Sequence, residues 1–218
     1  GFQYLKLRHR LEIMLVDKTN PFGNEHLLPR GVLREPIRNV RRADFIFITK
    51  SDGDSEALRA RLRALNPAAE IIECRHRPRY LQNVYTAEHE PLDWLRGRTV
   101  ASLSGIAVPQ SFENSLRAMG AKVVYCERYA DHHRYNAQEI IDALNKAADL
   151  HTDALLTTEK DAVRFPHLES TPVPVYYLRV DIELLSGTES FHDAVERICL
   201  RRQGKKETLA DNAQTSGA

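Results

Sequence analysis

Short apolar runs alternate with stretches of helical periodicity along most of the chain. The apolar runs have the length of strands and predict buried strands of a mostly parallel sheet; they lie at Leu11–Asp17, Asp44–Thr49, Ile71–Cys74, Thr99–Leu103, Lys122–Cys126, Ala154–Thr157 and Val173–Leu178. Helical spacing of apolar residues, with starting and ending signals, predicts helices at Ser55–Leu65, Pro109–Met119 and Asn136–Leu150. This alternation predicts an α/β fold with a largely parallel sheet and flanking helices.

Two stretches depart from this pattern. Residues Arg75–Asp93 contain two prolines and scattered polar residues without a clear period, which indicates a linker or an edge hairpin between two lobes. The last stretch, Gln203–Ala218, is polar and almost free of large apolar residues. We expect this tail to be disordered, because it offers too little apolar surface to form a core.

Composition narrows the class of protein. The 218 residues are 42% hydrophobic, which is enough for a substantial core. No apolar run approaches the roughly 20 residues of a spanning helix, and no signal peptide is visible, so we expect a soluble or peripheral protein. The net charge is +1, but residues 1–79 carry 16 Lys and Arg against 10 Asp and Glu. This basic third favours phosphates or an anionic bilayer as ligands.

The loop that follows the first predicted strand is the first candidate site. It runs from Lys18 to Pro36, at the carboxyl end of a strand, where α/β sheets bind their ligands. Arg34 offers forked donors for phosphate or carboxylate, and Glu35 could hold that arginine or accept a hydrogen bond from a sugar hydroxyl. An ordinary loop salt bridge between Arg34 and Glu35 explains the pair about equally well.

Two further polar motifs lie at predicted strand ends. Asp131-His132-His133 precedes a predicted helix, and imidazole suits proton handling near neutral pH. The residues alone favour a solvated histidine pair or a helix-capping aspartate. Thr157–Asp161 is typical of a helix N-cap followed by acids, so we expect a mainly structural role, although a helix N-terminus also attracts anions.

Four motifs in this order resemble tetraacyldisaccharide 4'-kinase, the lipid A 4'-kinase family. They are Gly1-Phe2-Gln3, the loop Pro21–Pro36, Asp131-His132-His133 and Thr157–Val163. The resemblance implies a P-loop-kinase-like α/β lobe that is N-terminally truncated, joined by a β-stranded linker to a second, smaller α/β lobe. On this basis we expect residues 1–74 to belong to the kinase lobe, 75–93 to the linker, 94–202 to the second lobe and 203–218 to the tail.

The resemblance also implies site residues. Gln3, Arg34 and Glu35, together with Asn24, match substrate-side groups of the family, and His132 matches its catalytic histidine, with His133 as the less favoured choice. The aspartate that partners this histidine in the family is absent from the chain. Tyr4 stands where the family often has histidine, and a phenol does not carry a proton near neutral pH.

The implied cofactors are ATP and Mg²⁺, held mainly by an upstream region, because the chain lacks a G-x-x-x-x-G-K-[ST] loop. We therefore expect no metal ligands in this chain and no activity from it alone. The implied partners are the lipid A disaccharide precursor and an anionic membrane surface, not nucleic acid, with peripheral attachment to the cytoplasmic face of the inner membrane. A metal-dependent phosphoesterase built on Asp131-His132-His133 and a non-catalytic fragment remain the alternatives.

Overall fold

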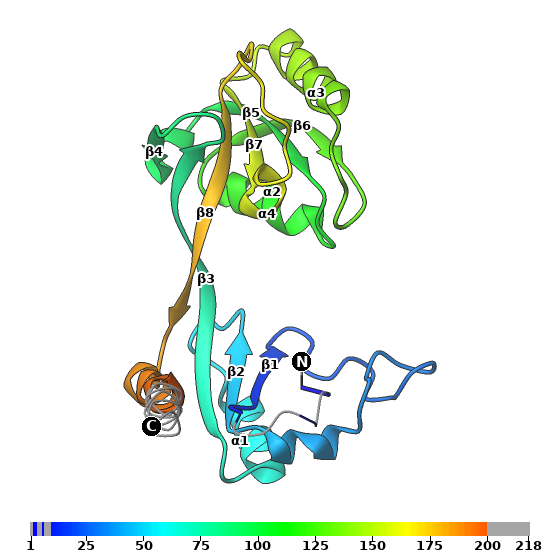
Figure 1. Ribbon diagram of the computed structural model, residues 1–218, viewed down its shortest axis with the longest axis vertical. Coiled ribbons are helices and arrows are strands. Elements are labelled where there is room, and N and C mark those ends of the chain that lie inside the picture. Colours follow the sequence, from blue (N-terminus) through cyan, green and yellow to red (C-terminus); the bar gives the residue numbers. More distant parts are fainter. Residues whose placement is uncertain (1, 4–5, 7–9, 200–218) are drawn as a thin grey trace, which may run out of the picture. The chain divides into compact units, whose positions relative to one another are not determined.

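The computed structural model describes residues 2–3, 6 and 10–199, which belong to two compact units (Figure 1). Unit 1 takes in residues 1–76 and 182–218, and unit 2 takes in residues 77–181. Tyr4 and the tail from Gln203 to Ala218 lie outside the described residues. The expectations for that tyrosine and that tail therefore stay predictions.

Unit 1 contains a parallel sheet in the order β1-β2-β3. Its elements are β1 (Ile13–Asp17), a 3-10 helix η1 (Ile37–Arg42), β2 (Phe45–Thr49), α1 (Glu56–Leu65), the first part of β3 (Glu70–Asn83) and a helix at 188–199. Successive side chains of a strand point to opposite faces of the sheet. Residues 45–48 of the central strand β2 are apolar, so both faces of the sheet must be covered by other elements.

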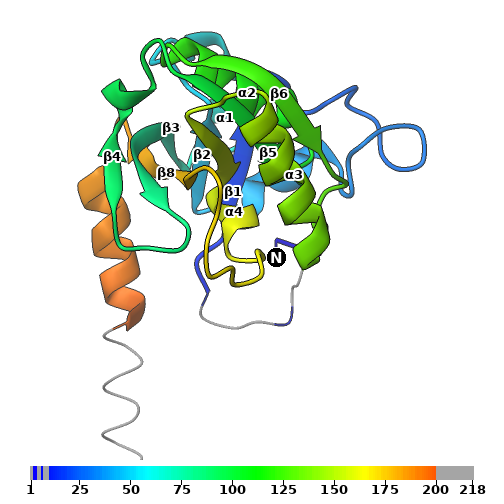
Figure 2. The same ribbon diagram turned by 90° about the horizontal axis from the view of Figure 1, so that it is seen from above.

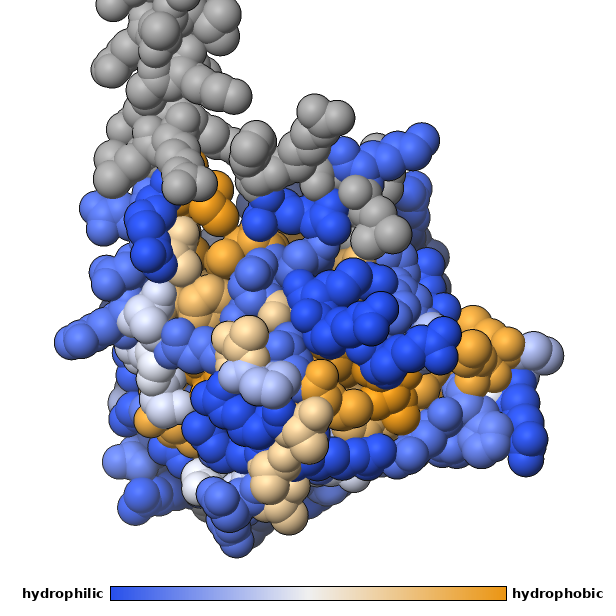
Figure 3. All heavy atoms as spheres, turned by 90° about the horizontal axis from the view of Figure 1, so that it is seen from below, coloured by the Kyte–Doolittle hydropathy of each residue, from blue (hydrophilic) through white to orange (hydrophobic). Residues whose placement is uncertain are grey.

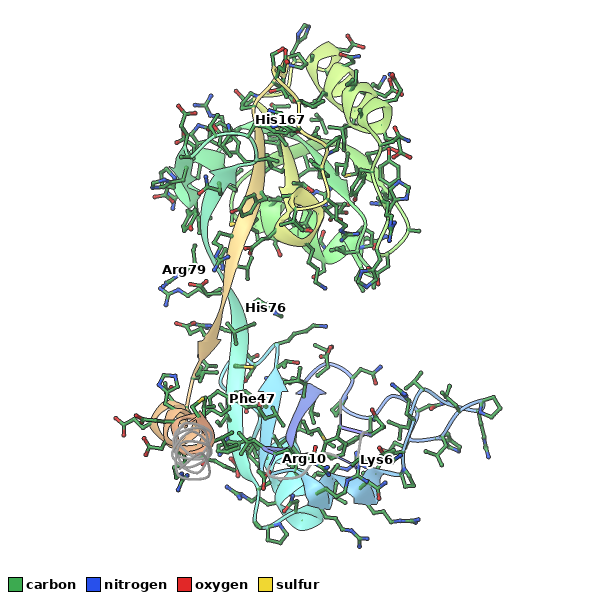
Figure 4. All side chains as sticks on the ribbon, in the orientation of Figure 1. Lys6, Arg10, Phe47, His76, Arg79 and His167 are labelled. Atoms are coloured by element: carbon green, nitrogen blue, oxygen red, sulfur yellow. The ribbon has the colours of Figure 1, made fainter. Side chains whose placement is uncertain are left out.

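The side chains of β2 show this covering directly. Ile46 and Ile48 are fully buried in a cluster that includes Leu62 of α1 and residues of η1. Phe45 and Phe47, which alternate with them, pack on the other face against the helix at 188–199. Phe191 of that helix contacts both rings edge-on, at centroid distances of 5.4 and 5.0 Å; Figure 4 labels Phe47 on β2. Residues 45–48 of this strand are all apolar because both of its faces are core.

Unit 2 also contains a sheet whose two faces are both covered. Strands β8, β7, β5 and β6 pair in parallel in that order, and β4 pairs antiparallel with β3. Its elements are β4 (His89–Pro91), η2 (Leu92–Leu95), β5 (Thr99–Ser104), α2 (Pro109–Ala118), β6 (Lys122–Arg128), α3 (Ala137–Asp149), β7 (Ala154–Thr158), α4 (Glu159–Ala162) and β8 (Val175–Leu184). Alternate residues of β5 and β7 enter two clusters, one with α2 and one with α3.

The predicted α/β class with a largely parallel sheet is confirmed, and each predicted strand and helix is present. Two strands extend well past their predicted ends, β3 to Asn83 and β8 to Leu184. The capping box that starts α3 is complete, since the Asn136 side chain accepts from the Glu139 N–H and the Glu139 carboxylate accepts from the Asn136 N–H. The sequence analysis did not predict η1, η2 or the helix at 188–199, and it gave the hairpin that contains β4 only as an alternative for residues 75–93.

The units divide the chain differently from the expected boundaries. Within residues 75–93, β3 continues without a break to Asn83 and β4 pairs antiparallel with it, so the hairpin alternative for this stretch is formed. The linker boundaries at 75 and 93 stay a prediction. The expected second lobe at 94–202 ends earlier, since residues from Ile182 belong to unit 1, where the helix at 188–199 packs on β2. The connection is made by β3 and β8, whose side chains form the ion pairs Arg75–Glu183 in unit 1 and Arg79–Asp181 in unit 2. Figure 4 labels Arg79.

Candidate functional site

A cleft of about 270 Å³ lies in unit 1 beside β1. Three residues predicted to bind substrate, Gln3, Arg34 and Glu35, are part of its lining. The remaining lining is mostly apolar and comes from β1, the loop that follows it and η1; it includes Ile13, Met14, Leu15, Phe22, Leu33 and Val40. The cleft thus combines an apolar wall with a few polar groups, the composition typical of small-molecule sites.

Glu35 is held in the cleft by residues of η1. Its Oε2 accepts hydrogen bonds from Asn39 Nδ2 at 2.7 Å and from Arg42 Nη2 at 2.7 Å. The Asn39 hydrogen bond, followed by the bond and charge of Arg42, lowers the pKa of Glu35 below its usual value. Glu35 therefore presents a fixed, ionised carboxylate at neutral pH.

Arg34 is exposed and makes no ion pair with any residue that the structure describes. An Arg34–Glu35 salt bridge, the structural alternative to a ligand-binding role for this pair, is not formed, because Glu35 pairs with Arg42 instead. The positive charge of Arg34 lies close enough to Glu35 to contribute to its low pKa. The forked donors of Arg34 are consequently available to an anion in the cleft.

Arg42 is a residue that sequence reasoning missed. Besides pairing with Glu35, its Nη2 donates to the Phe2 carbonyl at 3.2 Å, and its guanidinium lies 4.5 Å from the centre of the Phe2 ring. It thereby ties the residue next to Gln3 to the wall of the cleft. The spacing of Glu35, Asn39 and Arg42, four and then three residues apart, was a usable helical signal for this cluster.

Asn24, the fourth predicted substrate residue, does not line the cleft. Its side chain organises the loop instead, with Nδ2 donating to the Arg30 carbonyl at 3.0 Å and Oδ1 accepting from the His26 N–H at 3.3 Å. The geometry gives Asn24 a structural function in the loop, and its contact with substrate stays a prediction.

In unit 2, Asp131, His132 and His133 lie in the loop between β6 and α3. The His132 side chain is 77% exposed, and its Nε2 lies 3.8 Å from Asp131 Oδ2. Its backbone is left-handed, with φ of 63°, and its N–H donates to the Gly105 carbonyl at 3.2 Å. The backbone of His132 is thus fixed, whereas its imidazole faces solvent.

His133 has a different environment. Its ring stacks on Tyr129, with centroids 4.5 Å apart and an angle of 23° between the planes. Its Nε2 lies 3.1 Å from both carboxylate oxygens of Glu139 in the first turn of α3. His133 therefore contributes to packing and to the start of α3, whereas the imidazole of His132 is exposed. A catalytic role for His132 stays a prediction.

A buried carboxylate, Asp161, connects the loops at the carboxyl ends of β5, β6 and β7. Asp161 is fully buried, and its oxygens accept from the Gly105 N–H at 3.1 Å, the Tyr135 hydroxyl at 3.0 Å and the Thr158 hydroxyl at 2.7 Å. Its charge is paired with Arg164 at 3.2 Å. Because all these donors converge on one group, the carboxylate is well satisfied despite its burial.

The same network reaches the histidine loop. Arg164 also donates to the His133 carbonyl at 2.9 Å, so the Asp161 cluster holds the segment that carries His132. Burial, followed by the charge of Asp161, raises the pKa of Tyr135, which keeps its hydroxyl protonated as a donor. The expected structural role of Thr157–Asp161 agrees with this geometry, since Thr158 caps α4 by accepting from the Asp161 N–H.

Two kinds of feature are absent from residues 2–3, 6 and 10–199. No group of three or more His, Cys, Asp or Glu is placed to hold a metal ion. Two-metal phosphoesterases need such a convergence, so the geometry gives that alternative no support. A search of the same residues for a helix with the length and apolarity of a membrane span found none.

Comparison with known proteins assigns the family. The family model for LpxK, described as tetraacyldisaccharide-1-P 4'-kinase, matches residues 1–199. The tetraacyldisaccharide 4'-kinase of Anaeromyxobacter dehalogenans strain 2CP-C is 41% identical over 201 residues, which are 89% of this chain and 53% of that protein. The protein of the same name from Halothermothrix orenii is 34% identical over 215 residues, covering 90% of this chain and 56% of that protein.

The fold agrees with this assignment. The crystal structure of the "apo" form of LpxK from Aquifex aeolicus in complex with ATP matches with a TM-score of 0.62 and 25% identity, over 91% of this chain and 55% of that chain. The chain spans about half the length of the curated relatives that it matches. On the family match, the sequence similarity and the fold together, this chain belongs to the LpxK family of tetraacyldisaccharide 4'-kinases.

Proposed function

We propose that this chain carries the sugar-phosphate side of a kinase that phosphorylates the 4'-hydroxyl of a tetraacylated glucosamine disaccharide with ATP, a step of lipid A biosynthesis. The observation that carries the proposal is the family match over residues 1–199, since relatives of this chain bear the name of that activity. The cleft supports it, because an acylated sugar phosphate needs an apolar wall and a cation, and the cleft offers both.

In this proposal Arg34 binds phosphate oxygens of the substrate. It is exposed, it forms no ion pair with a described residue, and a guanidinium binds phosphate through two parallel hydrogen bonds. Glu35 is ionised and fixed by Asn39 and Arg42, so it accepts a hydrogen bond from a sugar hydroxyl. Gln3 adds an amide that donates to phosphate or accepts from a hydroxyl.

His132 is the proposed catalytic residue. Its imidazole is exposed on a loop whose backbone is held by Gly105 and by the Asp161 cluster. Phosphoryl transfer needs the attacking hydroxyl to be oriented and relieved of its proton, and an imidazole does this near neutral pH. His133 already has partners in Tyr129 and Glu139, so it is the poorer choice.

The described residues do not fit a Mg²⁺ site, since no three acidic or histidine side chains converge and Glu35 is already bonded to Asn39 and Arg42. The sequence also has no G-x-x-x-x-G-K-[ST] loop for nucleotide phosphates. We therefore assign ATP and Mg²⁺ to residues outside this chain and expect the isolated chain to be inactive. The acylated substrate implies peripheral work at the cytoplasmic face of the inner membrane.

The test joins this chain to the upstream half of the Anaeromyxobacter dehalogenans relative and measures ATP-dependent transfer of phosphate to detergent-solubilised tetraacyldisaccharide 1-phosphate. We expect transfer by the joined protein and none by the isolated chain. A joined protein that is folded and binds ATP, yet transfers no phosphate to this lipid, would refute the proposed activity.

Two variants of the joined protein then test the roles. Arg34→Ala should raise the KM for the lipid about tenfold or more, while Arg38→Ala, an exposed arginine of η1 outside the cleft lining, should change little. His132→Asn should lower kcat about a hundredfold without weakening ATP binding, because asparagine accepts the left-handed backbone but removes the imidazole. Equal losses from Arg34→Ala and Arg38→Ala would remove Arg34 from the site.

A further inference from the structure

The backbone of His132 has a conformation that must be held by its surroundings. Its φ of 63° lies in the left-handed region, which a Cβ atom disfavours. Such a conformation persists only where neighbouring contacts over-determine it. His132 lies in the loop between β6 and α3, and α4 directly follows β7, as Figures 1 and 2 show from two directions. The contacts that hold His132 come from the ends of the neighbouring strands β5 and β7.

Asp161 is the buried charge on which these contacts end. Charged side chains usually face solvent, and hydrophilic side chains are exposed around patches of hydrophobic ones on the face that Figure 3 shows. The Asp161 side chain, by contrast, is fully buried in unit 2. A buried charge is stable only when hydrogen bonds and an opposite charge satisfy it. The groups that satisfy Asp161 are therefore held in fixed positions.

The first connection from Asp161 to His132 runs through the backbone of Gly105, directly after β5. The Gly105 N–H donates to Asp161 Oδ2 at 3.1 Å, and the Gly105 carbonyl accepts from the His132 N–H at 3.2 Å. A Cβ atom at Gly105 would lie 2.7 Å from the Tyr135 hydroxyl oxygen, so this close approach requires glycine. The amide nitrogen of His132 is thus joined to the buried carboxylate through one residue.

The second connection is the guanidinium of Arg164, in which all three nitrogens have an acceptor. Nη1 donates to the His133 carbonyl at 2.9 Å and Nε donates to the Lys160 carbonyl at 2.9 Å. Nη2 lies 3.2 Å from Asp161 Oδ1. Because the guanidinium is planar, three acceptors fix its orientation as well as its position. Arg164 thereby fixes the backbone one residue beyond His132.

The two connections hold the backbone of His132 from both sides, and both end on the same carboxylate. We propose that Arg164 is a positioning residue for His132, acting through the His133 carbonyl and anchored by Asp161. This inference rests on the proposed function, in which His132 is the catalytic residue. Arg164 need not touch the substrate for this role. A misplacement of about 1 Å at a reacting group can lower a rate about a hundredfold, so a fixed starting point for the imidazole matters to catalysis.

Two variants separate positioning from stability. Arg164→Met removes the whole guanidinium and leaves Asp161 without its counter-charge, so it should lower the melting temperature by several degrees. Arg164→Lys keeps a positive charge beside Asp161, but an ammonium lacks the fork that also reaches the His133 carbonyl. We expect lysine to recover most of the lost stability and none of the positioning.

NMR relaxation of this chain measures the positioning directly. The amide order parameter of His132 should be about 0.85 in the unchanged chain and below about 0.6 in Arg164→Lys, with loss of the chemical shifts typical of a left-handed backbone. The matched control is Arg98→Lys. Arg98 Nη1 pairs with Asp153 at 3.0 Å beside the amino ends of β5 and β7, so the same substitution there should leave His132 unchanged.

Kinetics of the protein joined to its upstream half measure the consequence. Arg164→Lys should lower kcat about tenfold and leave KM for the lipid and for ATP within about twofold, while Arg98→Lys should change neither. A merely structural arginine predicts instead that lysine restores kcat together with stability.

Three results would overturn the proposal: an unchanged order parameter of His132 in Arg164→Lys, an equal change in Arg98→Lys, or a normal kcat in Arg164→Lys. The relaxation measurement uses neither ATP nor lipid. It therefore decides whether Arg164 holds His132 independently of phosphate transfer by the joined protein, whose absence would refute the proposed function.

Discussion

The polar motifs of unit 1 and those of unit 2 differ in what their charged groups contact. In unit 1 Arg34 makes no ion pair with a described residue, and it lines a cleft beside the ionised Glu35. In unit 2 Asp161 is fully buried, and its carboxylate is surrounded by three hydrogen-bond donors and by Arg164. The first arrangement leaves capacity for a ligand, whereas the second is complete by itself.

This difference shows that a dense polar motif has two distinct uses. Charged groups at a strand end bind a ligand when their partners are incomplete, and they organise neighbouring loops when their partners are all present. One loop of unit 2 contains both kinds of environment, since His133 has partners in Tyr129 and Glu139 while the ring of His132 is exposed. Mutations of groups whose partners are all present should therefore lower stability, whereas mutations of exposed groups should leave stability nearly unchanged.

The largest expected effect on stability comes from Asp161→Ala. Removing this carboxylate leaves Tyr135, Arg164 and the Gly105 N–H without their buried partner, so we expect the free energy of unfolding to fall by about 3 kcal/mol. Arg34→Ala should change it by no more than about 0.5 kcal/mol. Urea unfolding of the two variants measures both values, and similar losses would contradict the comparison.

Gly31→Ala should have the next largest effect, confined to unit 1. The added methyl group would overlap Asn24 Oδ1 and the His26 carbonyl, so we expect a cost of about 2 kcal/mol, taken up by opening of the loop. Amide hydrogen exchange should show faster exchange at Leu28, Gly31 and Leu33, with unit 2 unchanged. Unchanged protection in the loop would show that its backbone accommodates a side chain.

Mutations of the two adjacent histidines should differ by a smaller amount in their effect on stability. His133→Ala removes the stack on Tyr129 and the contact with Glu139, so we expect a loss of about 1 kcal/mol in stability. His132→Asn should be close to neutral, because the His132 ring is 77% exposed and asparagine tolerates its positive φ. Thermal unfolding compares the two, and a larger loss from His132→Asn would reverse their assigned roles.

The smallest expected effect is a change in pH dependence through Glu35. Its folded pKa lies below the usual 4.5, chiefly through Asn39 and then Arg42, so its contribution to stability is present above about pH 4.5 and is lost as the pH falls through the folded pKa. Glu35→Gln should flatten the decline in stability on acidification. Chemical unfolding at a series of acidic pH values measures the slope, and an unchanged slope would contradict this account.

The sequence predicted regular elements well wherever one strand or helix obeys a single period. The run Asp44–Thr49 became β2, and Asn136–Leu150 became α3 with its capping box. The helix at 188–199 was missed, as was the continuation of β3 to Asn83. These elements are stabilised by contacts between segments far apart in the chain, such as Phe191 with Phe45 and Phe47, and local periodicity does not encode such contacts.

For the candidate site, the sequence named Gln3, Arg34 and Glu35, and the structure places all three along one cleft. It did not name Asn39 and Arg42, which fix Glu35, although their helical spacing was visible. Tyr135 and Arg164 were also missed as partners of Asp161. Nothing in their spacing marks them, because the three strand ends that carry this cluster meet only in the folded sheet.

The sequence alone determined the α/β class, the order of strands and helices, and the types of side chain at the strand ends, since hydrophobic period and capping residues act over a few neighbouring positions. Only the tertiary structure decided which polar groups have all their partners and which do not. That distinction depends on burial and on contacts between distant segments, as Asp161 and Arg34 demonstrate.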